Sequence, residues 1–285
     1  MKKFNELITL CMVSFHSDKI IKKILKTIPL EYKVIVTDNG LSKDLKSVLE
    51  SSFKNVEVII PGSNLGNGGG INFALNKIST KYALYLDVDT VLEEDTIDRL
   101  IKIANSESNW GIIAPNLKNF YYKENCYLEK YVSQEISHMN FIEGCALLLN
   151  MKEFNIIGFY DEKIFLYFEE NDLFFRCLKN NKNIILCHNI NIEHLGNGSV
   201  DDKYSLEIEL NRNWHYMWSK FYYYKKNYSY LRGLKETLTQ FIKASIKLVF
   251  YYFTNKDKFL IYRSRASGLF NSYLNKTSWK RPYIR

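Results

Sequence analysis

The stretch that decides the fold reads Lys81-Tyr82-Ala83-Leu84-Tyr85-Leu86-Asp87-Val88-Asp89. Its first six residues are largely apolar and aromatic, which predicts a buried strand. The carboxylates of Asp87 and Asp89 follow that strand directly. In an open α/β sheet, acids at the carboxyl end of a strand lie in the crevice where ligands bind. Two acids this close can hold a hard divalent cation, which neutralises phosphate oxygens.

A D-x-D sequence is a weak motif on its own, because acidic pairs after strands often cap helices or lie in solvated turns. Here Asp89 and Thr90 are also suited to cap a helix that starts near Glu93. The two interpretations have to be separated by the rest of the chain.

Strand and helix signals alternate on both sides of this stretch. Apolar runs predict strands at residues 7–13, 33–37, 56–60 and 110–114, and helical spacing predicts helices at 18–28, 42–49, 74–78 and 94–104. Repeated β-α units predict an α/β fold with a Rossmann-like, mostly parallel sheet and helices on both faces. After residue 115 the pattern loosens, with a loop predicted at 116–139, strands at 141–150 and 183–187, and a helix at 169–178.

The last part of the chain differs in composition from the rest. Residues 203–285 contain 17 Lys and Arg but only 4 Asp and Glu, whereas the whole chain carries a net charge of +8. We therefore predict a domain over residues 1–200 and a basic, aromatic helical region over 201–285. That region holds one apolar stripe at helical spacing, flanked by Lys243 and Lys247: Leu238, Phe241, Ile242, Ser245, Ile246, Val249, Phe250 and Phe253.

A second candidate binding element is the glycine-rich run from Asn64 to Asn72, which includes Gly66 and leads into a helix. Glycines let a backbone approach a ligand closely, and the amides at a helix N-terminus favour anions. Asn72 is expected to face the cleft from the first helical turn. The run matches neither the dinucleotide fingerprint nor a P-loop, and an ordinary loop is the competing interpretation.

Two further polar residues follow predicted strands. Asp38 ends the strand at 33–37, where it can form an Asx turn or accept a hydrogen bond from a base or ribose. His194 precedes a Gly-Asn-Gly-Ser segment, Gly196–Ser199, expected to be flexible. A lone histidine is usually structural, but neutral imidazole is also a common metal ligand and could complete a site with Asp89.

A second acidic centre lies in an aromatic stretch, with acids at Asp161, Glu162, Glu169, Glu170 and Asp172. Burial and like-charged neighbours are expected to raise the pKa values of such carboxylates. A carboxylate of this kind can act as general base on a hydroxyl. Capping of the helix predicted at 169–178 is the alternative explanation for some of these acids.

Taken in order, these elements resemble the family 2 glycosyltransferases of the GT-A fold, especially bacterial rhamnosyl- and galactofuranosyltransferases. The ordered match covers residues 7–200 and consists of these segments: Val13-Ser14-Phe15-His16-Ser17, Asp38-Asn39-Gly40, the glycine run, Leu86-Asp87-Val88-Asp89-Thr90, Gly144, Gly158-Phe159-Tyr160-Asp161-Glu162, Glu169-Glu170-Asn171-Asp172-Leu173 with Arg176, and His194.

The resemblance implies inverting transfer of a sugar from a UDP- or dTDP-sugar to a saccharide hydroxyl, as in the synthesis of capsule, O-antigen or another bacterial surface glycan. It implies that Asp89 and His194 bind Mg²⁺ or Mn²⁺ and that Glu170 is the catalytic base. The nucleotide-binding residues would be Ser14, Asp38, Asn64, Gly66, Asn72 and Asp87. The acceptor side would include Glu169, Asp172 and Gly144.

Two departures from the family pattern stand out. The family usually has Glu-Asp where this chain has Glu169-Glu170, which moves the base outward by about one methylene. It often has Tyr-Asn or a similar pair at Phe15-His16.

Two rival functions remain to be weighed. A sugar-phosphate nucleotidyltransferase would show a glycine-rich loop with a basic residue after the first strand, and Val13–Ser17 has neither property. A non-catalytic nucleotide-sugar-binding module would need no second acidic centre. A metal-dependent glycosyltransferase is thus the favoured reading.

The basic region 201–285 admits several roles. Its lysines suit anionic headgroups and its Trp and Tyr suit a membrane interface, as expected if the acceptor is a lipid-linked saccharide. A helical cap over the acceptor side or a homodimer contact is equally consistent. Binding of RNA or single strands is a third option, but we expect no nucleic-acid partner because no recognised motif supports one.

The location of the protein is also suggested by what the sequence contains. The five cysteines form no C-x-x-C pair, which is typical of reduced thiols in a cytoplasmic protein. No signal peptide is recognised, and no uninterrupted apolar run is long enough to span a bilayer. We therefore expect a cytoplasmic protein, peripheral on the inner face of the plasma membrane.

Overall fold

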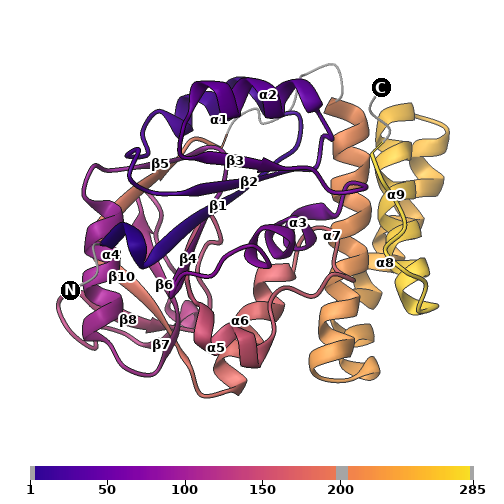
Figure 1. Cartoon of the computed structure of the whole chain (residues 1–285). Coiled ribbons are helices and arrows are strands. Elements are labelled where there is room, and N and C mark those ends of the chain that lie inside the picture. The colour runs from indigo at the N-terminus through magenta and orange to yellow at the C-terminus, as the bar shows by residue number, and fades with distance from the viewer. Residues whose placement is uncertain (1–3, 197–204, 283–285) are drawn as a thin grey trace. The chain divides into compact units, whose positions relative to one another are not determined.

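The computed structural model describes residues 4–196 and 205–282, which divide into two compact units (Figure 1). Unit 1 is drawn from Met1–Leu65, Gly70–Tyr160 and Leu173–Ser199, and unit 2 from Gly66–Gly69, Asp161–Asp172 and Val200–Arg285. The boundary predicted at 200/201 and the predicted flexible residues 197–199 lie outside the described residues. That boundary stays a prediction.

Within the described residues, unit 1 is built on one ten-stranded sheet in the order β3-β2-β1-β4-β9-β6-β10-β8-β7, with β5 paired to β10. The strands have these bounds: β1 Ile8–Ser14, β2 Val34–Asp38, β3 Val56–Ile59, β4 Tyr82–Leu86, β5 Thr90–Leu92, β6 Trp110–Leu117, β7 Tyr127–Glu129, β8 Ile136–Met139, β9 Ala146–Asn150 and β10 Asn183–His194.

The long strands of this sheet run in a common direction around one exception. Strands β3, β2, β1 and β4 pair in parallel, as do β6 and β10. Strand β9 is antiparallel to both β4 and β6, so it joins the two parallel groups while keeping their directions the same. The carboxyl ends of β1, β2, β4 and β10 therefore face one edge, as predicted for a mostly parallel sheet.

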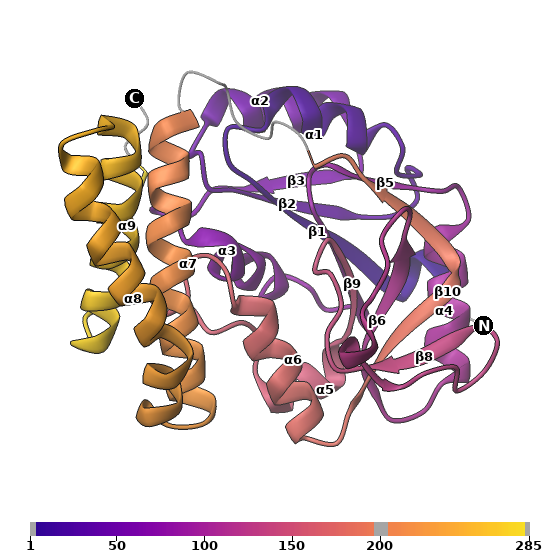
Figure 2. The ribbon, with the colours of Figure 1, turned by 180° about the vertical axis from the view of Figure 1, so that it is seen from behind.

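Helices cover both faces of the sheet (Figures 1 and 2). On one face lie α1 (Asp18–Leu25), α2 (Lys43–Ser52) and α4 (Thr96–Ser106), whose apolar sides share a core with Leu84. On the other lie α5 (Met151–Ile157) and the unit 1 parts of α3 (Gly66–Leu75) and α6 (Glu169–Lys179), whose core includes Tyr85. Because neighbouring strand residues point to opposite faces, the apolar run 82–86 supplies both cores.

The structure corrects several predicted element bounds. Helix α3 begins at Gly66, so it contains the glycine run instead of following it, and Asn72 lies in its second turn. The segment predicted as a loop at 116–139 holds the end of β6, a 3-10 turn at Glu124–Cys126, and β7 and β8. Strand β5, helix α5 and a 3-10 turn at Phe4–Glu6 were not predicted.

Close packing explains why a glycine-rich segment is helical here. A Cβ atom at Gly70 would lie 2.9 Å from Cγ1 of Val13 on β1, and the Gly70 carbonyl accepts a hydrogen bond from Thr37 on β2 (2.8 Å). Glycine is a poor helix former, but its lack of a side chain lets α3 approach the sheet backbone.

Helices account for most of unit 2: α7 (Ser205–Asn227), α8 (Tyr230–Tyr252) and α9 (Lys256–Tyr273). Each packs against the other two around Met217, Phe221 and Leu269. The side chains of Ser229 and Asn255 cap the N-termini of α8 and α9. In the part of the chain that the structure describes, no helix combines the length and the apolar character needed to cross a membrane.

His215 on α7 is a fully buried histidine with both ring nitrogens engaged. A carbonyl can only accept, so Nε2 donates to the Lys280 carbonyl (2.8 Å), and Nδ1 of the neutral ring accepts from the Ser278 hydroxyl (3.0 Å). Burial, together with the charge of nearby Arg281, lowers the pKa of His215 to about 3.

This depressed pKa makes unit 2 sensitive to acid. Below pH 6.5, the ordinary histidine pKa, His215 binds a proton in the unfolded chain. In the folded chain it stays neutral until the pH approaches about 3. Unfolding free energy should thus fall by about 1.4 kcal/mol per pH unit within this window through His215 alone. We expect His215→Gln to remove that share of the pH dependence, measured by urea unfolding at pH 7 and pH 5.

Tryptophan fluorescence gives the readout, because Trp214, Trp218 and Trp279 all lie in unit 2 and only Trp110 lies in unit 1. His188→Gln serves as the control substitution, because His188 is a partly buried histidine of unit 1 and not of unit 2. Equal pH dependence in wild type and His215→Gln would contradict the prediction.

Candidate active site

The turn after β4 carries Asp87 and Asp89. The Asp87 amide donates to the Cys145 carbonyl (2.9 Å), and the Thr90 amide closes the turn on the Asp87 carbonyl (3.1 Å). Thr90 then starts β5, and helix α4 begins only at Thr96 with Asp95 at its N-cap. The alternative that Asp89 and Thr90 cap a helix near Glu93 is therefore wrong.

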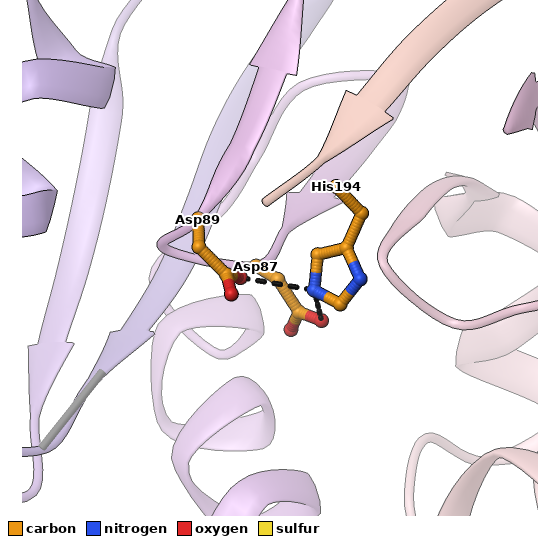
Figure 3. Close-up of side chains that lie close together, drawn as sticks. All are labelled: Asp87, Asp89 and His194. Carbon is orange, nitrogen blue, oxygen red and sulfur yellow. Dashed lines mark hydrogen bonds and ion pairs between the residues drawn. The ribbon is translucent and has the colours of Figure 1, made fainter. Parts of the chain in front are cut away.

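His194 reaches this turn because β5 pairs with the end of β10. Thr90 and His194 are opposite each other in the antiparallel ladder, and the Leu195 amide donates to the Asp89 carbonyl (3.0 Å). As a result His194 Nε2 lies 3.0 Å from Asp89 Oδ1 and 3.7 Å from Asp87 Oδ2 (Figure 3). The structure thus brings His194 to two acids that lie far earlier in the sequence.

These three side chains each offer one ligand atom, and the atoms lie within 4.8 Å of one another. Their chemistry suits a divalent cation, because carboxylate oxygens bind Mg²⁺ and Mn²⁺ and imidazole binds transition metals. Burial raises the pKa of Asp87 to about 6, and the neighbouring Asp89 charge adds to the effect. A cation at this point would relieve that repulsion, so the residues present fit a metal site.

The contact between Asp89 and His194 shifts the pKa values of both side chains. Burial works to raise the pKa of Asp89, but the hydrogen bond and charge of His194 outweigh it and hold the pKa below its usual value. In return the hydrogen bond to Asp89 raises the pKa of His194. Since metal ligands must be deprotonated, His194 would hold a cation through a ring nitrogen that carries no proton.

Two residues that were not predicted from the sequence, Tyr85 and Glu143, lie beside these candidate ligands. The buried Tyr85 hydroxyl donates to Asp87 Oδ1, which fixes the carboxylate and leaves Oδ2 on the His194 side. Glu143 lies close enough for its charge to act on His194, and burial raises the pKa of Glu143. Glu143 directly precedes Gly144, a predicted site residue, and this position in the sequence is the signal that could have identified it.

At the carboxyl end of β2, Asp38 is completely buried and forms the Asx-type turn that was one of its two interpretations. Its carboxylate accepts from the amides of Ser42 (2.7 Å) and Gly40 (3.2 Å). Burial raises the pKa of Asp38. Ser14 ends β1 directly opposite Asp38 in the parallel ladder. Contact of either residue with a nucleotide stays a prediction.

The residues around the glycine run make hydrogen bonds within each of the two units. In unit 1, Asn39 accepts from the Leu65 amide (3.2 Å), next to the predicted Asn64. The buried Asn72 bonds the Tyr160 backbone twice, donating to its carbonyl and accepting from its amide, both at 2.9 Å. Asn72 thereby holds the segment that follows Gly158, and its predicted contact with a nucleotide remains a prediction.

In unit 2, Gly66 has a left-handed backbone with φ of 78°, and a Cβ there would lie only 2.1 Å from the Phe165 carbonyl oxygen. That oxygen accepts from the Asn67 amide (3.0 Å). The start of α3 is therefore seated on the backbone that leads into α6. Tyr167 and Phe168, just before α6, also have positive φ angles of 64° and 67°, a conformation that side chains rarely adopt.

The acids at the start of α6 differ in burial and in hydrogen-bond partners. Glu169 is almost fully buried and accepts from Asn67 Nδ2 (3.0 Å). Asp172 is completely buried, 2.7 Å from Lys226 Nζ, and accepts from Asn227 (3.0 Å). Glu170, between them in sequence, is only partly buried. Glu169, Glu170 and Asp172 all lie in the first turn, where acids favour a helix as well.

The expected rise in pKa fails for one acid of this centre. Although burial acts to raise the pKa of Asp161, the hydrogen bond from Lys226 Nζ (2.7 Å) brings it below the usual range. A lysine from α7 was not visible in the local sequence around residue 161, so like-charge crowding was overestimated there.

Comparison with known proteins assigns the family. The family model described as "Glycosyl transferase family 2" matches residues 13–168. A low-salt glycan biosynthesis hexosyltransferase, Agl10 of Haloferax volcanii, is 23% identical over 210 residues, which cover 66% of each chain. The chain therefore spans just under two thirds of the length of this curated relative.

Solved structures show the same fold at low identity. The mannosyltransferase PcManGT from Pyrobaculum calidifontis, in complex with GDP-Man and Mn²⁺, has a TM-score of 0.59 and 10% identity, covering 95% of this chain and 88% of that one. S. aureus TarS in complex with UDP has a TM-score of 0.53 and 14% identity, covering 93% and 89%.

These likenesses agree with the resemblance drawn from the ordered motifs of residues 7–200. The family match spans more than half of the chain and includes both the D-x-D turn and the segment leading into α6. The chain belongs to glycosyl transferase family 2.

Proposed function

We propose that this chain is an inverting glycosyltransferase that moves a sugar from a nucleotide-diphosphate sugar, with UDP or dTDP as the nucleotide, to a saccharide hydroxyl. The observation that carries the proposal is the convergence of Asp87, Asp89 and His194 in a family 2 chain. Relatives with this fold include complexes with GDP-Man and Mn²⁺ and with UDP-GlcNAc. The proposed setting is the synthesis of a bacterial surface glycan such as capsule or O-antigen, with rhamnosyl or galactofuranosyl transfer as the specific form.

The proposed cation is Mg²⁺ or Mn²⁺, held by Asp89 and His194 with Asp87 beside them. When bound, such a cation neutralises charge on the diphosphate. The protein's own contribution is to aim the ligands. Tyr85 fixes the Asp87 carboxylate, and the β5–β10 pairing fixes His194 against Asp89. The nucleotide contacts proposed for Ser14, Asp38, Asn64, Gly66 and Asn72 rest on the family resemblance.

Glu170 is the proposed base. Its carboxylate takes the proton of the acceptor hydroxyl as that oxygen bonds to the anomeric carbon of the donor. The bond from the anomeric carbon to the diphosphate oxygen breaks with its electron pair, so the nucleoside diphosphate leaves and the configuration inverts. Glu170 is only partly buried, which leaves its side chain more accessible to an acceptor than those of Glu169 and Asp172, which are almost fully buried.

Donor hydrolysis tests the proposal without knowledge of the acceptor. The full chain is incubated with UDP-, dTDP- and GDP-sugars with Mn²⁺, with Mg²⁺ and with a chelator, and release of nucleoside diphosphate is measured. We expect one nucleotide to be preferred and turnover to stop on chelation and return with the metal. For the preferred donor, NMR should give a first-formed sugar of inverted anomeric configuration. Hydrolysis that continues in chelator, or with retention, would exclude the proposal.

A further inference from the structure

Helix α8 carries an exposed apolar face that the folding of unit 2 does not use. Ile246 and Val249 are each 64% exposed and Phe253 is 80% exposed. Successive members of this face are three, four or seven residues apart, so they lie along one side of the helix. We call them the α8 stripe: Leu231, Leu238, Ile242, Ile246, Val249 and Phe253.

The opposite side of α8 already supplies the helix packing of unit 2. Gly233, Thr237 and Ala244 are buried, and the ring of Phe241 lies 5.5 Å from that of Tyr273 on α9. The helix is therefore apolar on two sides, whereas a helix that only covers a core needs one. Monomeric soluble proteins rarely leave a continuous apolar face exposed unless it binds something.

The charge around the α8 stripe indicates which partner fits. Residues 230–273, which span α8 and α9, contain eight Lys and Arg but only two Asp and Glu. Lys243 follows Ile242 on α8 and is exposed, and Lys247 reaches the Tyr262 hydroxyl (3.0 Å). Phe250 and Tyr252, 60% and 66% exposed, extend the apolar surface at the same end of α8.

These features favour an anionic bilayer over the other partners. A second copy of the chain would bring an equally basic face against this one, which costs repulsion. A single-stranded nucleic acid is bound by stacking on aromatic rings, whereas the stripe is mostly Leu, Ile and Val. Anionic headgroups meet the basic residues while the aliphatic side chains enter the acyl boundary.

We propose that the α8 stripe docks unit 2 on the surface of a membrane rich in anionic lipid, with α8 lying in the interface. The charged residues Arg232, Lys235, Lys243 and Lys247 within α8 accord with a helix that lies on a bilayer. The inference extends the proposed function, because such docking would bring the enzyme to a lipid-linked acceptor. It needs no transfer chemistry to operate.

Vesicle cosedimentation of the full chain tests the docking. Phosphatidylcholine vesicles are compared with vesicles that also contain phosphatidylglycerol, without donor or cation. We expect binding to the anionic vesicles and a loss of at least about tenfold in partitioning for the double variant Ile242→Gln/Ile246→Gln. Lys243→Gln should weaken binding to anionic vesicles about fivefold and leave the neutral vesicles unaffected.

Ile156→Gln is the matched control, because Ile156 is 76% exposed on α5 of unit 1. Circular dichroism shows whether each variant is folded. Equal partitioning of wild type and the double variant overturns the proposal. The proposal is also overturned if the wild type does not bind vesicles but forms a dimer, measured by light scattering, and the double variant does not form that dimer.

The docking and the proposed function fail separately. Donor hydrolysis in solution should be unchanged in Ile242→Gln/Ile246→Gln. Vesicle binding that depends on the stripe in a chain that hydrolyses no donor would refute only the proposed function.

Discussion

Asp89→Ala is expected to abolish cation-dependent binding of the donor nucleotide. Asp89 touches His194 at 3.0 Å and shares the ligand cluster with Asp87. Substitution of a residue that hydrogen-bonds to a metal ligand typically lowers metal affinity 10- to 100-fold. Loss of a ligand itself should therefore lower the affinity by roughly a hundredfold or more. Calorimetry of the preferred nucleoside diphosphate with and without Mn²⁺ measures the effect.

Glu94→Ala is the matched control for this experiment, since it removes an exposed carboxylate only five positions away. The control should bind nucleotide and metal like wild type. A folded Asp89→Ala protein with unchanged, Mn²⁺-dependent binding would show that the cluster of Asp87, Asp89 and His194 is not the metal site.

Glu170→Gln is expected to reduce turnover by roughly a hundredfold to ten-thousandfold, the usual contribution of a general base. Glutamine keeps the size and hydrogen-bonding capacity of the side chain but cannot take a proton at neutral pH. Donor binding, measured by calorimetry, should stay within about twofold because the substitution removes an interaction made only in the transition state.

Two further variants separate a base from a structural acid. Glu170→Asp restores the carboxylate that the family usually has here and should retain measurable turnover. Glu162→Gln removes an exposed acid of the same unit and should leave turnover unchanged. Near-normal turnover in Glu170→Gln would assign the base elsewhere.

The fold could be predicted from sequence where one local pattern had one meaning. The run at 82–86 is apolar at every position, and the structure buries each of these residues in a central strand that feeds both cores. The proximity of Asp87 to Asp89 is built into their spacing. His194 was a candidate ligand because it follows a predicted strand, but only the family resemblance favoured a ligand over a structural histidine.

The remaining features depend on contacts that no local pattern reports. A glycine suits position 70 because a Cβ there would crowd Val13, and Thr37 binds the Gly70 carbonyl; both residues lie far away in sequence. Glu143 gains its place from the return of β9 beside β4, a pairing that periodicity does not reveal. On α8, helical spacing predicted the apolar residues, yet it could not tell inward Phe241 from the exposed Ile242.

The three-residue pairing of β5 with β10 has a thermodynamic consequence. Asp89 and His194 are 105 residues apart, and they meet through the antiparallel ladder between β5 and β10. A ligand that needs both side chains binds only molecules in which this pairing has formed. It then adds about 2.7 kcal/mol to the unfolding free energy at a concentration of a hundred times its Kd. In unit 1, occupancy of the site and stability of the β5–β10 pairing are therefore thermodynamically linked.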